Sequence, residues 1–94
     1  MADNFSGMNV EAITGQVVPG FRQQSEAVRA VISAVEKLIG VVQTDWKGQD
    51  SQQFIQKWQG EYRSPLQKLA EELNELSSTA QRNAENQRQT SSSL

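Results

Sequence analysis

The chain has 94 residues, with nine Lys and Arg against eleven Asp and Glu, and it contains neither His nor Cys. Such a length predicts a single domain spanning residues 1–94, and a net charge of −2 excludes the basic surface of a nucleic-acid-binding domain. The missing Cys and His exclude a disulfide framework and remove the commonest metal ligands and general bases. We therefore expect no enzyme, no catalytic residue, no cofactor and no metal site.

The first predicted helix covers about residues 10–44 and follows a loose lead-in over residues 1–8. Asn9 is placed to cap this helix, with Glu11 in its first turn. Apolar residues recur at the three- and four-residue spacings of a coiled coil, namely Val10, Ile13, Val17, Phe21, Val28, Val31, Val35, Leu38 and Val42. A second apolar line, Val18, Ile32 and Ile39, runs beside the first, with Ser25 in its gap. Pro19 predicts either a kink or a break in this helix.

A turn over residues 45–49 is expected to lead into a second helix over about residues 50–86. Asp50 followed by Gln53 resembles a capping box at its start. The second stripe consists of Ile55, Trp58, Tyr62, Leu66, Leu69, Leu73, Leu76 and Ala80. Pro65 predicts another kink, and the polar residues 87–94 are expected to form a disordered tail.

The predicted fold is all-α, a hairpin of two long amphipathic helices that dimerises into an antiparallel four-helix bundle. Two adjacent apolar lines are wider than one partner helix covers, so Ile32 and Ile39, or their neighbours, would face water in a lone hairpin. The spacing of Phe54, Trp58 and Tyr62 puts them on one helix face, and a core role is expected for them. The candidate core of hairpin and dimer is Phe21, Val28, Ile32, Val35, Ile39, Val42, Phe54, Trp58, Tyr62, Leu66, Leu69, Leu73 and Leu76.

Between the two predicted helices lies the sequence Trp46-Lys47-Gly48, a Trp-Xaa-Gly motif near the middle of the chain. In this position the motif resembles the WXG family, the small ESAT-like proteins that type VII systems export. The resemblance covers nearly the whole chain. It includes the length of the chain and Phe54, the apolar residue six after Gly48. Trp58, Ser64-Pro65 and the Leu-rich second helix also look like some Gram-positive members.

The resemblance implies a small protein secreted without a cleaved signal peptide, and cytoplasmic before export. Its partners would be itself, a homodimer being favoured, or a WXG paralogue, together with the secretion machinery. Many members that present the export signal carry Tyr-x-x-x-Asp or Tyr-x-x-x-Glu after the second helix. Here the single Tyr is Tyr62, followed four residues later by Leu66, so the signal comes either from a partner or from another feature.

Two roles stay open for Trp46 and Gly48. In the structural role, Trp46 packs over the end of the hairpin and Gly48 supplies a positive φ for the turn. In the functional role, Trp46 additionally forms a groove that the export machinery recognises. The alternatives to a secreted protein are a cytoplasmic coiled-coil adaptor or chaperone, and a membrane-active helical protein. The mixed charges of the first helix make membrane binding the weaker of these.

Overall fold

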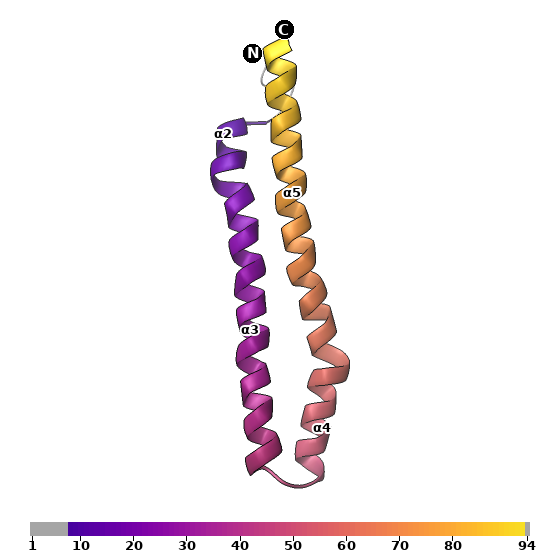
Figure 1. The fold of residues 1–94 in the computed structure, drawn as a ribbon. Coiled ribbons are helices and arrows are strands. Elements are labelled where there is room, and N and C mark those ends of the chain that lie inside the picture. Colours follow the sequence, from indigo (N-terminus) through magenta and orange to yellow (C-terminus); the bar gives the residue numbers. More distant parts are fainter. Residues whose placement is uncertain (1–7, 94) are drawn as a thin grey trace.

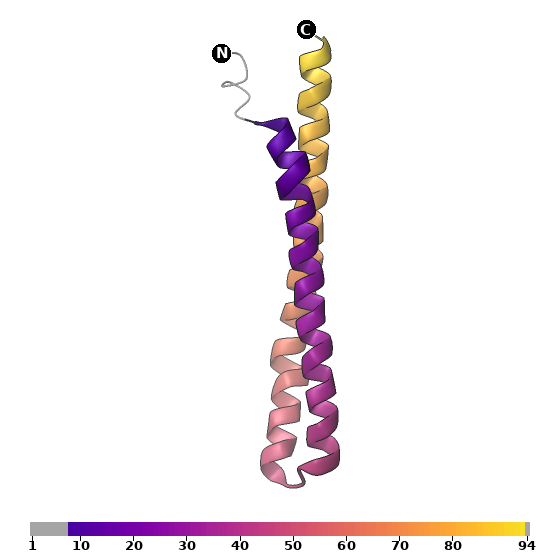
Figure 2. The ribbon, with the colours of Figure 1, turned by 90° about the vertical axis from the view of Figure 1, so that its left-hand side faces the viewer.

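Two helical arms run side by side in opposite directions and are joined by one short turn, so the fold is an all-helical hairpin (Figure 1). The computed structural model describes residues 8–93, which extend over 68 × 18 × 17 Å. The first arm consists of α2 (Val10–Ala12), η1 (Ile13–Val17) and α3 (Val18–Asp45). The second arm consists of α4 (Gln49–Lys57), η2 (Trp58–Tyr62) and α5 (Arg63–Ser93). In the view turned by 90°, α3 lies in front of α5 and then beside α4, so the arms twist about one another (Figure 2).

The first arm begins where the sequence predicts. The Asn9 side chain accepts a hydrogen bond from the backbone N–H of Ala12 at 3.1 Å, and Glu11 lies in the first turn. The cap satisfies one of the backbone donors that a helix start leaves free. Apart from Met8, the expected lead-in lies outside the described residues.

Neither proline breaks its arm, because a π-turn precedes each of them. The Val18 N–H donates to the Ile13 carbonyl, and the Arg63 N–H donates to the Trp58 carbonyl, each five residues back. A π-turn accommodates one extra residue in the helix, next to the carbonyl that Pro19 or Pro65 leaves without its usual donor. The expected kinks are thus local widenings of two continuous arms.

Small side chains let the arms approach closely in the half of the hairpin away from the turn. Ser25, Ala70, Ser77 and Ala84 are each 0% exposed. Ser25 Oγ donates to the Ala70 carbonyl and Ser77 Oγ donates to the Val18 carbonyl, both at 2.7 Å. These bonds satisfy the buried hydroxyls and fix the longitudinal register of α3 against α5.

Larger side chains fill the half nearer the turn. A buried cluster is formed by Ile32, Ile39, Ile55 and Trp58, with Val28, Val35, Val42 and Leu66 partly buried against it. On α3 the most buried positions are Val18, Ser25, Ile32 and Ile39, spaced seven residues apart. We call this line, together with its neighbours Ala70, Ser77 and Ala84 on α5, the hairpin seam.

The ends of the second arm differ from the sequence expectation. Gly48, not Asp50, is the N-cap of α4, and Asp50 instead lies in the first helical turn. At the other end α5 continues to Ser93, where a disordered tail was expected from residue 87. No Gly or Pro follows Pro65 before residue 93, and Ala84 is anchored in the seam, so nothing interrupts the helical hydrogen bonding.

Candidate interaction surface

The turn brings two aromatic rings together at one end of the hairpin. Trp46 ends the first arm, its N–H donating to the Val42 carbonyl at 3.0 Å, and its ring centroid lies 6.0 Å from that of Phe54. Gly48 has φ +133°, the positive value expected from the sequence. Ser51 Oγ donates to the Gly48 carbonyl at 2.7 Å and secures the start of α4. Trp46 stays 46% exposed, so it does not close the end of the hairpin as a buried residue would.

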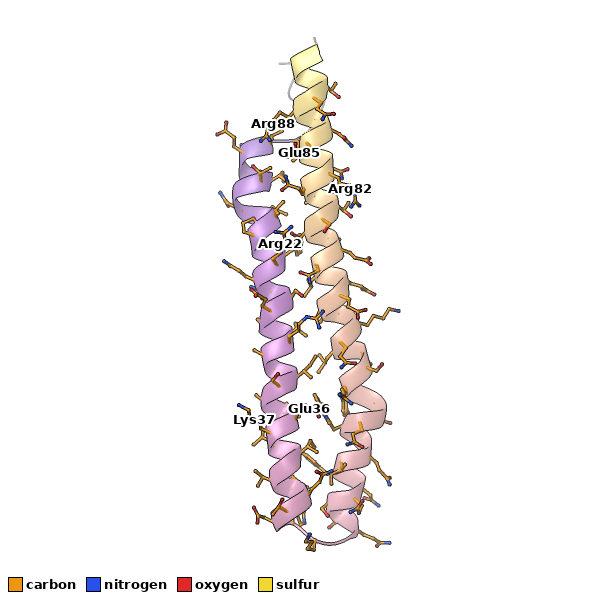
Figure 3. The ribbon with its side chains drawn as sticks, viewed as in Figure 1. Arg22, Glu36, Lys37, Arg82, Glu85 and Arg88 are labelled. Carbon is orange, nitrogen blue, oxygen red and sulfur yellow. The ribbon has the colours of Figure 1, made fainter. Side chains whose placement is uncertain are left out.

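The carboxylate of Glu36 on α3 contacts two residues of the second arm. The indole Nε1 of Trp58 donates to Glu36 Oε2 at 2.8 Å, and Arg63 Nε lies 2.9 Å from Glu36 Oε1. Figure 3 shows Glu36 on the side of α3 that faces the second arm, whereas Lys37 points away from it. One carboxylate therefore binds two groups of the second arm next to η2, and its hydrogen bonds are of the stronger, charge-assisted kind.

Large apolar side chains remain exposed along the hairpin. They are Val31 at 52%, Leu38 at 60%, Val41 at 55%, Phe54 at 50%, Tyr62 at 52%, Leu69 at 43% and Leu76 at 49%, besides Trp46. Scattered single apolar residues need no explanation, but a contiguous row of them marks a surface that a partner covers.

Five of these residues, Val31, Leu38, Phe54, Leu69 and Leu76, lie on one side of the hairpin. Val31 and Leu38 each precede a buried seam residue of α3, and Leu69 and Leu76 each precede a buried seam residue of α5. Phe54 likewise precedes the buried Ile55. Because both arms are right-handed helices running in opposite directions, positions one residue before the seam point to the same side of the pair. We call this side the apolar face.

The predicted core residues therefore divide into two groups. Ile32, Ile39 and Trp58 lie in the hairpin core, and Val28, Val35, Val42 and Leu66 pack against it. Phe21 and Leu73 are half-buried, whereas Phe54, Tyr62, Leu69 and Leu76 are exposed in the hairpin. Of the four aromatic residues expected in the core of hairpin and dimer, only Trp58 is buried within the hairpin. Ile32 and Ile39 do not face water, but their neighbours Val31 and Leu38 do.

The sequence interpretation missed the serines of the seam. Ser25, Ser51 and Ser77 are the largest fully buried side chains of the described residues, at 0%, 1% and 0% exposure. Ser25 was recognised only as a gap in an apolar line. Its seven-residue spacing from Val18 and Ile32 was the available signal, since a small hydroxyl in a heptad position permits close contact between helices.

These features define a class of small helical proteins. Its members fold as a hairpin, and this one has a Trp-Lys-Gly turn and one exposed apolar face. The WXG100 family, described as proteins of 100 residues with WXG, matches the chain over residues 9–92. The chain belongs to this family. No curated protein and no solved structure matched the chain.

Membership associates the chain with type VII secretion, for which WXG100 proteins serve as small structural or effector proteins. Within residues 8–93 no helix combines the length and the hydropathy of a membrane span. The same residues contain no group of three or more acidic side chains that could hold a metal ion.

Proposed function

We propose that the chain is a substrate and structural partner of a type VII secretion system and is exported as a folded dimer. The exposed apolar face supports this proposal, because a hairpin has no interior of its own on that side. Two hairpins that bury these faces together form an antiparallel four-helix bundle. Removing that much apolar surface from water is the main driving force of such an association.

A homodimer is the arrangement that we favour. Both arms contribute to the apolar face of a single chain, and the net charge of −2 gives little repulsion between copies. The other arrangement is a heterodimer with a WXG paralogue, which would supply a Tyr-x-x-x-Asp or Tyr-x-x-x-Glu signal of its own. In either case the protein acts by binding, with the dimer presenting its turns or its helix ends to the machinery.

Sedimentation of the purified chain tests the dimer. We expect the mass of two chains at micromolar concentration, with or without a paralogue encoded nearby. A mass of two chains only after mixing with that paralogue would select the heterodimer. A single ordered chain at every concentration, with no paralogue bound, would contradict the proposal.

Export is tested in the cells that produce the protein. A tagged chain is expected outside wild-type cells and absent outside cells that lack the secretion ATPase. A chain that stays inside wild-type cells while binding a partner there would instead be an adaptor or chaperone. Leakage of liposomes at low protein concentration would favour a membrane-active protein.

Trp46 tests the contact with the machinery. Because Trp46 is half-exposed, we expect Trp46→Ala to lower export much more than it lowers helicity measured by circular dichroism. Lys47→Ala is the matched control in the same turn and should leave export unchanged. If Trp46→Ala melts the hairpin as well, the residue has a structural role alone.

A further inference from the structure

The second arm contributes nothing to the hairpin core over a stretch at η2. Residues 59–65 are all exposed, whereas Trp58 before them is buried and Leu66 after them is partly buried. Elsewhere between residues 51 and 87 no more than three exposed residues occur in a row. Seven residues cover more than a full turn of an α-helix or a π-helix. One inward position of the second arm is therefore left unfilled.

Tyr62 would fill this position if α4 continued as a regular helix. The buried residues at this end of the arm are Ser51, Ile55 and Trp58, at spacings of four and three. The same alternation leads to Tyr62, four residues after Trp58. In the structure the extra residue of η2 intervenes, and Tyr62 is 52% exposed. The position of the π-turn thus decides whether Tyr62 faces α3.

A hollow of about 130 Å³ lies beside Tyr62. It is lined by Val35 of α3 and by Phe54, Lys57, Trp58 and Tyr62 of the second arm, and we call it the Trp58 hollow. Its walls are largely apolar, and a cavity of about 150 Å³ with such walls is large enough to bind benzene. Side chains of a helix lean toward its N-terminus, so the ring of an inward-facing Tyr62 would lie toward Trp58, where the hollow is.

Pro65 is compatible with a π-turn one turn further along the arm. Because proline has no N–H, the Glu61 carbonyl lacks the donor that residue 65 would supply in an α-helix. In a π-turn over residues 62–66, the N–H of Leu66 donates to the Glu61 carbonyl and that of Gln67 to the Tyr62 carbonyl, each five residues back. The N–H that Pro65 lacks is then not needed.

Glu36 opposes this shift of the π-turn. Arg63 Nε lies 2.9 Å from Glu36 Oε1, and a π-turn placed one turn later would rotate Arg63 by about 100° away from this carboxylate. The bond from Trp58 Nε1 to Glu36 Oε2 lies before the residues that rotate and would remain. The paired side chains of Arg63 and Glu36 are 46% and 34% exposed, so their ion pair is weak enough to open.

We infer that η2 is a two-state element, in which the π-turn moves by one turn between residues 58–62 and residues 62–66. In the first state Tyr62 is half-exposed and Arg63 pairs with Glu36. In the second state the ring of Tyr62 occupies the Trp58 hollow and Arg63 is released. A protein partner that contacts the exposed Tyr62 stabilises the first state, and loss of the ion pair stabilises the second. Neither state requires a second copy, so the inference does not rest on the proposed dimer.

The single tyrosine of the chain allows the two states to be counted. Fluorotyrosine is incorporated at Tyr62, and fluorine NMR spectra with saturation transfer are recorded for every variant at the same protein concentration. We expect a major resonance at the shift of a solvent-exposed fluorotyrosine. A minor resonance, displaced by the ring current of Trp58, should exchange with it.

The ion pair is tested by Arg63→Gln, which should raise the population of the minor resonance about threefold or more. Lys68→Gln removes an exposed cation of α5 and is the matched control, which should leave the populations unchanged. A single resonance in both the original chain and Arg63→Gln overturns the inference. Equal populations in Arg63→Gln and Lys68→Gln overturn it as well.

Two further variants test the π-turn and the hollow separately. Removal of Gly60 together with Pro65→Ala takes away the extra residue, and Val35→Phe fills the hollow with another ring. Each should leave the exposed resonance alone, whereas Ala30→Phe, at an exposed position of α3, should keep both. Circular dichroism checks that each variant is helical, and Val35→Phe and Arg63→Gln still decide the matter if the deletion does not fold. A minor resonance retained in a folded deletion or Val35→Phe variant contradicts the inference.

Discussion

At the residue scale, Gly48 makes the turn possible. Its φ of +133° and ψ of 179° belong to a region that side chains other than glycine rarely adopt. The space around it is open, since an added Cβ would meet no atom within 4 Å. The requirement for glycine is therefore conformational and not a matter of room.

Gly48→Ala is expected to destabilise the hairpin by about 1–3 kcal/mol, the usual cost of such backbone strain. The melting temperature at fixed protein concentration should fall by about 5 °C or more. Gly40→Ala, in the middle of α3 and equally uncrowded, should stabilise the protein by up to about 1 kcal/mol through helix propensity. Equal effects of the two substitutions would contradict the role given to Gly48.

Glu36 joins the arms by accepting from Trp58 and pairing with Arg63. Glu36→Ala should cost about 1–2 kcal/mol, because it leaves the indole N–H without its acceptor, while the partly exposed ion pair adds little. Glu36→Gln keeps an acceptor and should cost less. Glu26→Ala, an exposed carboxylate of the same helix, serves as the control in thermal unfolding. If Glu26→Ala destabilises the protein as much as Glu36→Ala does, the contacts of Glu36 with Trp58 and Arg63 are not the cause of the lost stability.

At the scale of elements, the π-turn η2 adjusts the register of the second arm. Buried residues of the second arm repeat every seven residues, as Ser51 and Trp58 do up to the first residue of η2 and Ala70 and Ser77 do after η2. Across it, Trp58 and the half-buried Leu66 are eight residues apart. The one extra residue of the π-turn absorbs this insertion, so the seam stays in contact with α3 on both sides.

Deleting that extra residue tests the explanation. Removal of Gly60 together with Pro65→Ala restores a seven-residue repeat without a proline in the helix. We expect a melting temperature within about 5 °C of the original. Removal of Ser78 from the uninterrupted α5 is the control. It rotates the following residues by about 100°, takes Ala84 out of the seam, and should lower the melting temperature more strongly. Similar losses for both deletions would argue against a register function of η2.

At the scale of the whole molecule, two neighbouring residues separate folding from association. Ile39 is 3% exposed within the hairpin, whereas Leu38 is 60% exposed on the apolar face. Ile39→Asp should therefore unfold the hairpin, since it buries an unpaired charge.

Leu38→Asp should leave the helicity of the single chain intact and halve the sedimenting mass, because the carboxylate would be buried only in the proposed dimer. Ser33→Asp, at an exposed position on the charged side of α3, should alter neither property. Both are read from circular dichroism and sedimentation of the same samples. A dimer of normal mass for Leu38→Asp would remove the apolar face from the association.

The amino-acid sequence by itself was sufficient to predict two helices, the turn at Trp46-Lys47-Gly48, the Asn9 cap and the positive φ of Gly48. Each of these depends on neighbours within a few residues, where hydrogen bonding and backbone sterics act locally. The family followed from the same residues, because the motif and its place between two amphipathic helices are properties of the sequence.

The contacts between the arms could not be predicted in the same way. The two apolar lines of the first helix predicted that Ile32 and Ile39, or their neighbours, would face water in a lone hairpin, without deciding between them. The hairpin buries the line through Ser25, Ile32 and Ile39 and leaves Val31 and Leu38 exposed. Burial depends on how closely two backbones approach, and the fully buried Ser25, Ala70, Ser77 and Ala84 allow a close approach without appearing hydrophobic. Periodicity determined which residues share a helix side, and only the packing of one arm on the other decided which side faces inward.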